Sequence, residues 1–262
     1  MKKKYLHNLF LLLVFAFLYL PIIVLVIFSF NSSSLNIVFE QFTFRWYHVL
    51  LENRSLLEAF MNTMIVAFTS TIVSTIIGTI SAIGIKKYNF IGKEFIQSLL
   101  YIPIVIPEIV LGISLLSIYT LFRLDLSLVT LIIAHITFSI PFVIISVRTI
   151  LDSLPSNLED ASSDLGANKF KTFWYVTLPS IMPGITSGAL LAFTLSLDDV
   201  IISYFTAGPD SNTLPLKIYS MIKTGITPDV NALSALILVV TIIILMTSTV
   251  LQLRKLRKET EL

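Results

Sequence analysis

Long apolar runs constrain this chain more than any other feature of its sequence. Residues 8–31 contain no charged side chain, and five further runs of more than 20 residues contain at most two each. About 18 apolar residues suffice to cross a bilayer. The chain is also only 13% charged, whereas a soluble domain averages roughly 25%. The sequence therefore predicts a multi-span membrane protein.

The runs predict an all-α fold with six transmembrane helices, because a helix satisfies its own backbone hydrogen bonds in lipid. A signal peptide has an apolar core of only about 7–15 residues, so the first run is interpreted as a retained span. Residues 1–58 are expected to form this span and an outer interfacial segment, residues 59–253 a five-helix core, and residues 254–262 a tail. The predicted spans are 9–30, 59–85, 95–122, 126–147, 181–207 and 232–253.

The basic residues predict the orientation of the spans. With the N-terminus inside, 13 of the 18 Lys and Arg residues fall in inner segments and 5 in outer segments. An excess of Lys and Arg is typical of short cytoplasmic loops. Both termini and the long loop of residues 152–180 are therefore expected in the cytoplasm.

This loop has a pattern that predicts two short helices. Ser156 and Glu159 have capping-box spacing, and Gly166 can end the first helix in a left-handed conformation. Asn168 can cap a second helix, which Pro179 is expected to close. Helices that lie outside the bilayer with both ends tied to spans are suited to being held by another protein.

The same stretch resembles the EAA loop of type I permease subunits of ATP-binding-cassette (ABC) importers. That motif is Glu-Ala-Ala, three residues, Gly, nine residues, an aliphatic residue, any residue and Leu-Pro. The spacing here is the same, with Asp for Glu and Ser for the second Ala, at Asp160, Ala161, Ser162, Gly166, Val176, Leu178 and Pro179. Glu159, one residue earlier, is a second candidate for the acidic role. The resemblance implies that the loop docks into a cytoplasmic ATPase; an ordinary amphipathic loop is the alternative.

Four titratable residues lie inside the predicted spans: Glu108, His135, Asp198 and Asp199. Carboxylates inside a bilayer are costly and usually face a bundle interior or a cavity. Along straight helices, Glu108 and His135 lie at similar depth, so a substrate-path site and a structural pair are both open. Asp198 and Asp199 are expected near the outer end of their span. Successive helical residues point about 100° apart, so only one of these two can face a central path squarely.

A second resemblance is to the second permease subunit of spermidine/putrescine importers, and with the loop it covers most of residues 44–253. It rests on Ser196-Leu197-Asp198-Asp199, Thr213-Leu214-Pro215, Lys217-Ile218-Tyr219-Ser220-Met221 and Thr227-Pro228-x-x-Asn231-Ala232. It implies a prokaryotic cell-membrane heterodimer with a second permease. Its further implied partners are lipid, two copies of a cytoplasmic ATPase that binds ATP and Mg²⁺, and an extracytoplasmic binding protein. Glu108, Asp198 and Asp199 offer charge compensation for a polyamine cation.

Other function classes lack a signature. Gly92-Lys93 is followed by Glu94, so there is no phosphate-binding loop, and neither HExxH nor Gly-x-Ser-x-Gly occurs. No catalytic residue, metal site, cofactor or nucleic-acid partner is therefore expected, and ATP hydrolysis is assigned to another chain. Three rivals stay open: an importer of the same architecture for another solute or metal ion, a membrane anchor or sensor, and an intramembrane enzyme using Glu108 and His135.

Overall fold

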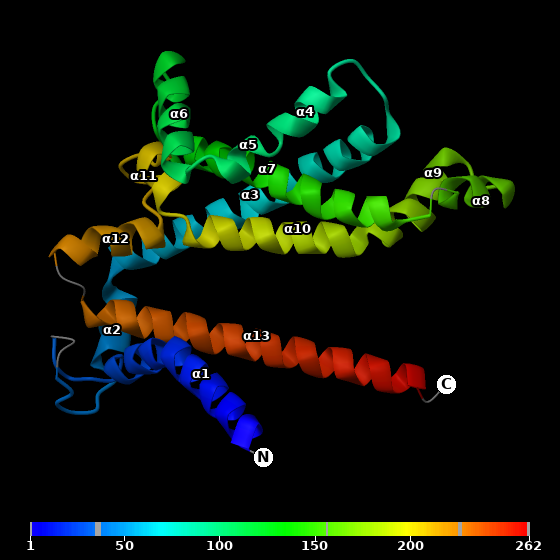
Figure 1. Cartoon of the computed structure of the whole chain (residues 1–262). Coiled ribbons are helices and arrows are strands. Elements are labelled where there is room, and N and C mark those ends of the chain that lie inside the picture. The colour runs from blue at the N-terminus through cyan, green and yellow to red at the C-terminus, as the bar shows by residue number, and fades with distance from the viewer. Residues whose placement is uncertain (1, 35–37, 156, 225–226, 261–262) are drawn as a thin grey trace. The chain divides into compact units, whose positions relative to one another are not determined.

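The computed structural model describes residues 2–34, 38–155, 157–224 and 227–260, and this part of the chain is mostly helical (Figure 1). Apart from one isolated bridge between Asn31 and Phe42, these residues contain no β-structure. The chain divides into a first unit, Met1–Leu57 with Ser220–Leu262, and a second unit, Glu58–Tyr219. The helices are α1 (Lys2–Phe28), α2 (Arg45–Glu52), α3 (Arg54–Lys87), α4 (Lys93–Leu99), α5 (Ile102–Val105), α6 (Glu108–Leu121), α7 (Leu128–Ser153), α8 (Leu158–Asp164), α9 (Lys169–Thr172), the π-helical η1 (Phe173–Thr177), α10 (Leu178–Asp198), α11 (Ile201–Thr206), α12 (Leu214–Thr224) and α13 (Pro228–Thr260).

Several of these helices are long and apolar enough to cross a membrane. Among the described residues, four meet this criterion alone: His7–Phe28, Arg54–Lys87, Leu128–Ser153 and Lys169–Asp198. The bent pair Lys93–Val105 and Glu108–Leu121 makes a fifth candidate, and a shorter apolar helix covers Pro228–Ile243. The prediction of a helical protein with several helices that are long and apolar enough to span a membrane is confirmed, while the count of six and the orientation of the termini stay predictions.

The first unit joins α1, α2 and the start of α13. The Trp46 indole donates a hydrogen bond to the Asn31 carbonyl at 2.6 Å, which holds α2 against the chain that follows α1. The Asn53 amide donates to the Asp229 carboxylate at 2.6 Å and ties the end of α2 to the first turn of α13. The predicted outer segment therefore contains a helix, α2, and its place at the membrane interface stays a prediction.

The second unit is built on α3, α7 and α10, which pack side by side (Figure 1). A Cβ added to Gly78 would lie 2.7 Å from the Val143 Cβ, and one added to Gly188 would lie 3.1 Å from the Val143 Cα. Small residues thus let the helices approach closely, as in other lipid-embedded bundles. The buried cluster between the three helices consists of Ala82, Ile85, Val143, Ile144, Val147, Leu151, Ile181 and Ala192.

The third predicted span is not one straight helix. Its residues form α4, α5 and α6, and the chain bends by 111° between Val105 and Glu108. Ile106 is extended, with a ψ of 134°, as the residue before a proline prefers. Pro107 has no backbone N–H with which to continue the helix. The argument that placed Glu108 along a straight span is therefore wrong, because Glu108 is the first residue of a new helix.

The fifth predicted span is also interrupted. α10 stops at Asp198, and Asp199 is extended with a ψ of 127° before α11 begins. The cause is the Asp199 carboxylate, which accepts hydrogen bonds from the backbone N–H groups of Ile202 at 3.1 Å and Ser203 at 2.7 Å. An aspartate that caps a following helix competes with continuation of the preceding one. The prediction of one continuous helix here is wrong.

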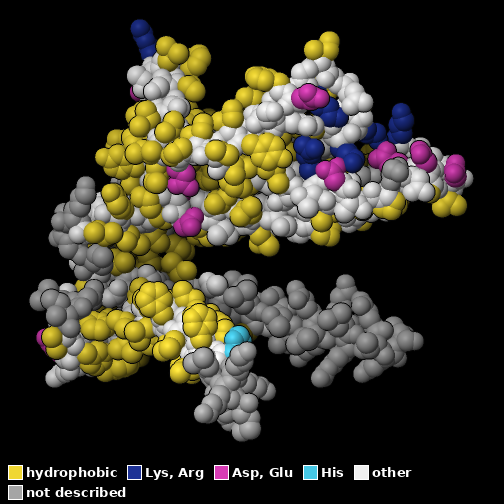
Figure 2. Space-filling model, viewed as in Figure 1, with side chains coloured by type: hydrophobic (Ala, Val, Ile, Leu, Met, Phe, Trp, Pro, Cys, Tyr) yellow, Lys and Arg dark blue, Asp and Glu magenta, His cyan; other side chains and the backbone are white. Residues whose placement is uncertain are grey.

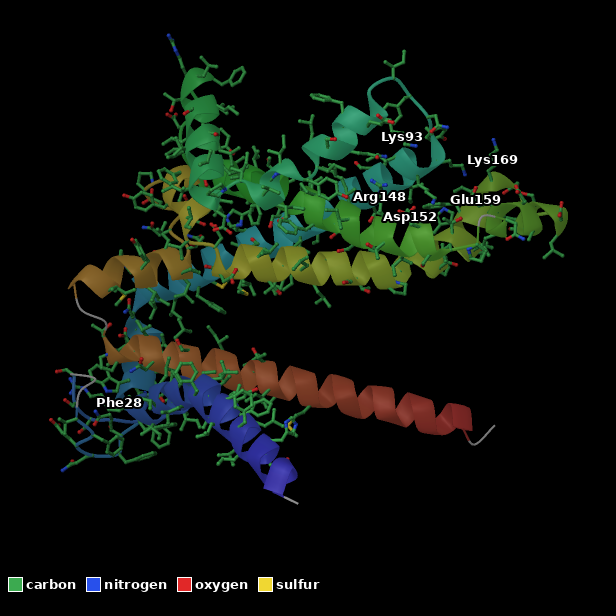
Figure 3. All side chains as sticks on the ribbon, viewed as in Figure 1. Phe28, Lys93, Arg148, Asp152, Glu159 and Lys169 are labelled. Carbon is green, nitrogen blue, oxygen red and sulfur yellow. The ribbon has the colours of Figure 1, made fainter. Side chains whose placement is uncertain are left out.

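The second unit has a charged end and an apolar body. On its visible face most Lys, Arg, Asp and Glu side chains gather towards the end that carries α8 and α9, and hydrophobic side chains cover much of the rest (Figure 2). Figure 3 places Asp152, Glu159 and Lys169 at the charged end. A surface divided in this way suits a chain with one end in water and a body in lipid.

Candidate functional site

The loop of residues 152–180 is called the coupling loop below, after the role that its motif predicts. It contains the first short helix that the sequence predicts. This helix, α8, is followed by Gly166 with a left-handed φ of 82°. The Gly166 N–H bonds the Ser163 carbonyl at 2.9 Å, and the Ala167 N–H bonds the Ser162 carbonyl at 3.2 Å. This is the Schellman arrangement, which satisfies the last carbonyls of a helix and favours glycine. The predicted conformation of Gly166 is confirmed.

The second helix of the coupling loop begins as predicted but ends differently. The Asn168 side chain accepts a hydrogen bond from the Lys171 N–H at 2.9 Å and so caps α9. α9 then continues through η1 into α10, with Pro179 in the first turn of α10. A proline in a regular helix clashes with the carbonyl four residues earlier; here that residue is Tyr175, which lies in the wider π turn. The prediction that Pro179 closes the helix is wrong.

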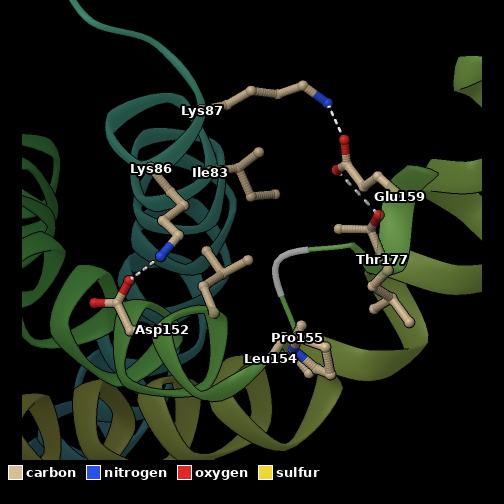
Figure 4. A pocket seen from close by; sticks show the side chains of 10 residues that line it. Ile83, Lys86, Lys87, Asp152, Leu154, Pro155, Glu159 and Thr177 are labelled. Atoms are coloured by element: carbon tan, nitrogen blue, oxygen red, sulfur yellow. Dashed lines mark hydrogen bonds and ion pairs between the residues drawn. The ribbon is translucent and has the colours of Figure 1, made fainter. Parts of the chain in front are cut away.

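The two candidate carboxylates of the motif have different surroundings. The Glu159 carboxylate binds the Lys87 ammonium at 2.6 Å, and the Thr177 hydroxyl donates to its other oxygen at 3.5 Å (Figure 4). Asp160 is exposed and forms no ion pair with any residue that the structure describes. Ser156, the predicted cap, lies outside the described residues. Glu159 is thus engaged within the chain, and Asp160 is open to a partner.

Ser162 joins the two short helices of the loop. Its side chain is buried, and its hydroxyl lies 3.1 Å from the Thr172 hydroxyl. An alanine, which the motif has at this position, forms no such bond. The adjacent Ala161 is exposed, whereas Val176 and Leu178 are half-buried where the loop enters α10. The serine therefore stabilises the helix pair that the Gly166 turn creates.

Several large hydrophobic side chains of the coupling loop are exposed although the loop is otherwise polar. Leu165 is 91% exposed, Phe170 71% and Tyr175 78%. The Phe170 ring lies 6.1 Å from the Trp174 ring, between centroids, so part of the group forms an aromatic cluster. Exposed apolar side chains that gather in one place commonly mark an interaction surface.

A pocket of about 540 Å³ lies where α3, α7, α8 and η1 meet (Figure 4). Two ion pairs border it: Lys86 with Asp152 at 2.7 Å, and Lys87 with Glu159 at 2.6 Å. Adjacent lysines of α3 thus reach two different elements, α7 and α8. The other residues that line the pocket are Ile83, Leu151, Leu154, Pro155, Leu158 and Thr177.

The three carboxylates predicted inside spans line a second, open pocket of about 270 Å³. Glu108 and Asp198 are exposed, whereas Asp199 is only 8% exposed because its oxygens cap α11. Two helix breaks create this acidic pocket, because the one before α6 presents Glu108 and the one after α10 presents Asp198. The remaining lining is Phe138, Leu195, Val200 and Ile201. Within the described chain, no group of three or more His, Cys, Asp or Glu side chains has the geometry to hold a metal ion.

His135 does not line the acidic pocket. It is fully buried, and its ring nitrogens lie 2.7 Å from the Ser196 Oγ and 3.1 Å from the Ser203 Oγ. Its Nε2 also lies 3.5 Å from the Asp199 carboxylate. Both nitrogens are therefore engaged, and the contact with Glu108 that the sequence left open is not formed among the described residues.

The network around His135 extends to α3. The Ser70 hydroxyl donates to the Ser196 Oγ at 3.2 Å, and the Ser203 hydroxyl donates to the Asp199 carboxylate at 2.7 Å. Side chains of α3, α7, α10 and α11 thus meet at one buried point beside the acidic pocket. Sequence reasoning missed these serines, because serine is common in spans and nothing local distinguishes them. The match at Ser196-Leu197-Asp198-Asp199 was the available signal.

Comparisons of sequence support one family. Residues 74–259 match the family described as binding-protein-dependent transport system inner membrane component. The chain is 38% identical over 239 residues to the spermidine/putrescine transport system permease protein PotC of Escherichia coli strain K12, which covers 91% of this chain and 90% of that protein. It is 37% identical over 235 residues to the putrescine transport system permease protein PotI of the same strain, covering 87% and 84%.

A comparison of structures agrees on the fold. A chain in the crystal structure of a bacterial ABC transporter involved in the import of the acidic polysaccharide alginate matches with a TM-score of 0.70 and 16% identity, over 96% of each chain. The predicted resemblance to permease subunits of ABC importers is confirmed. The chain therefore belongs to the family of inner membrane components of binding-protein-dependent transport systems.

Proposed function

We propose that this chain is a permease subunit of an ATP-driven importer of spermidine or putrescine and forms half of its translocation path. The observation that carries the proposal is the 38% identity to PotC over 91% of this chain. The acidic pocket supports the substrate class, because a polyamine is a multivalent cation that needs compensating carboxylates in a low-dielectric bundle. The chain is a transport component and not an enzyme; ATP and Mg²⁺ would bind a partner ATPase.

The proposed topology has six spans in a bacterial inner membrane: α1, α3, the bent α4–α6 segment, α7, α10 with α11, and α13. Both termini and the coupling loop lie in the cytoplasm, which is supported by the distribution of 13 inner and 5 outer basic residues. Residues 1–58 then form the first span with its outer segment, residues 59–253 the permease core, and residues 254–262 the tail. Alternating access would follow from rocking of the bundles.

The proposed assembly contains a second permease subunit, two copies of a cytoplasmic ATPase and an extracytoplasmic substrate-binding protein. The last partner is supported by the solved alginate transporter in complex with a periplasmic protein, to which this chain has a TM-score of 0.69. Large exposed hydrophobic side chains along α1, such as Phe17 at 80%, support contact with lipid or with a neighbouring subunit.

The coupling loop is the proposed contact with the ATPase. Asp160 is open to a basic side chain of that partner, and the exposed Leu165 and Phe170 offer it an apolar surface. Val176, Leu178 and Pro179 lie in the continuous helix from α9 to α10, which passes displacement of the loop into the fifth span. His135 and Asp199 hold the break after α10, while Glu108 and Asp198 face the substrate.

Thiol labelling tests the orientation, because the chain contains no cysteine. Ser163 is exposed on α8, and Asp125 is exposed between α6 and α7. In intact cells an impermeant thiol reagent is expected to label Asp125→Cys, and to label Ser163→Cys only after the membrane is permeabilised. Labelling of Ser163→Cys from outside would reject the proposed topology.

Uptake by a reconstituted complex tests the substrate. Proteoliposomes that contain both permeases and the ATPase, with the binding protein added, should take up radiolabelled spermidine or putrescine only when ATP is present on the side of the membrane that carries the ATPase. The unlabelled polyamines should compete for this uptake, whereas a neutral sugar or a divalent metal ion should not. Uptake of another solute in place of polyamines would assign the chain to an importer of the same architecture with a different substrate.

A further inference from the structure

We propose that Lys87 is a positioning residue that carries the movement of the coupling loop into α3 through its ion pair with Glu159. The inference rests on the proposed coupling role of the loop and adds a second route from the loop to the spans. The first route is the backbone itself, because α9, η1 and α10 form one continuous helix.

The second route begins at a single carboxylate. Glu159 lies on α8, bonds Lys87 at the last residue of α3, and accepts from Thr177, the residue directly before α10. The pocket of about 540 Å³ lies between these elements, so α8 and α3 are bridged there by side chains rather than by continuous packing (Figure 4). Among the described residues the Lys87–Glu159 pair is the only hydrogen bond or ion pair between α3 and α8.

The two routes meet again deep in the second unit. On α3, Ser70 lies 17 residues before Lys87, and on α10, Ser196 lies 18 residues after Leu178; each interval is about 26 Å of helix. The Ser70 and Ser196 hydroxyls are 3.2 Å apart, and the rings of Phe68 and Phe193 are 4.9 Å apart between centroids. α3 and α10 are therefore linked at two points that are separated by similar lengths of helix.

This arrangement has a mechanical consequence. If the loop displaced α10 alone, α10 would shear against α3 at the Ser70–Ser196 contact beside His135. With Lys87 bound to Glu159, the loop moves both helices together. The break after α10, which presents Asp198 to the acidic pocket, then follows the movement without disruption of the buried network.

The neighbouring ion pair provides a matched control. Lys86 binds Asp152 at 2.7 Å, with side-chain exposures of 50% and 49%, against 45% and 46% for Lys87 and Glu159. Both lysines lie in the last turn of α3, so they interact equally with the helix dipole, and both pairs are similarly hydrated. They differ in one respect: Lys86 reaches Asp152 in the last turn of α7, where the coupling loop begins, and Lys87 reaches Glu159 on α8 within the loop.

The test compares Lys87→Met, Lys86→Met and the charge exchange Lys87→Glu with Glu159→Lys in the complete reconstituted transporter. Lys87→Met should lower hydrolysis stimulated by the loaded binding protein, and uptake, by about fivefold, with the ATPase still co-purifying in full. Lys86→Met should stay within about twofold of wild type. The charge exchange should recover most of the stimulation. If Lys87 acted only through its positive charge at the end of α3, the exchanged pair would not recover it.

Three results would overturn the inference: unchanged stimulation in Lys87→Met, an equal loss in Lys86→Met, or no recovery in the exchanged pair when the ATPase is retained. A wild-type complex that failed to retain the ATPase at all would instead refute the proposed function. The co-purification measured with every variant separates these two failures.

Discussion

Replacing Gly166 by valine is expected to abolish most of the coupling between this chain and its ATPase. Gly166 has a φ of 82°, and an added Cβ would meet no described atom within 4 Å. The penalty is therefore one of backbone conformation and not of a clash inside this chain. A side chain in the left-handed region costs about 1–2 kcal/mol, and β-branching makes it harder still. To avoid that cost the turn must release its Schellman bonds, and α9 then loses its place beside α8.

The measurement is co-purification of the ATPase with each variant, together with substrate-stimulated hydrolysis. A cost of this size corresponds to roughly five- to thirtyfold weaker retention of the ATPase by Gly166→Val. Gly166→Asn should stay near wild type, because asparagine tolerates the left-handed region best among residues with a Cβ. Full binding and full stimulation in Gly166→Val would show that the loop is not the coupling element.

The chain also offers a matched control for the glycine. Gly92 has a φ of 87° in the connection between α3 and α4, and again no described atom lies within 4 Å of an added Cβ. Gly92→Val therefore carries the same backbone penalty at another loop of the same unit. It should leave retention of the ATPase unchanged, and an equal loss would attribute the effect of Gly166→Val to general destabilisation.

The local structure of the coupling loop was predictable because its signals act over a few residues. Gly166 and Asn168 stand where a helix must end and another must begin, and both were placed correctly. The continuation of the helix through Pro179 was not predicted, because it depends on a π turn that apolar periodicity does not encode. The different surroundings of Glu159 and Asp160 depend on Lys87, 72 residues earlier than Glu159, and no short-range pattern reports such a contact.

The apolar runs predicted where spans lie but not where they break. The third run contains Pro107, a local signal that was present and undervalued. The fifth run breaks at Asp199, where there is no proline or glycine, because Asp199 is held by α11 and by His135 from another helix. The pair of Glu108 and His135, which the sequence left open, is not formed among the described residues, since equal depth along two straight helices means little once one of them bends by 111°.

Neutralising both carboxylates that face the acidic pocket is expected to lower polyamine uptake by about a hundredfold while assembly survives. Glu108 and Asp198 are exposed in the same pocket, so water screens each of them partly. A screened attraction of about 1.4 kcal/mol per carboxylate gives roughly tenfold for Glu108→Gln or Asp198→Asn alone. The two single effects should be similar, because both residues line one pocket instead of lying at different depths of straight spans. Uptake per reconstituted complex is the measurement.

Two further substitutions separate binding from structure. Asp199→Ala removes the acceptor for two backbone N–H groups and the Ser203 hydroxyl, and with it the contact to His135, so it should lower the yield of complex and not only its uptake. Glu94→Gln neutralises an exposed carboxylate on α4 outside the pocket and should change neither the yield of complex nor its uptake. Spermidine carries more positive charge than putrescine, so its uptake should fall further in Glu108→Gln with Asp198→Asn. Unchanged uptake of both polyamines in that double variant would exclude the acidic pocket from the translocation path.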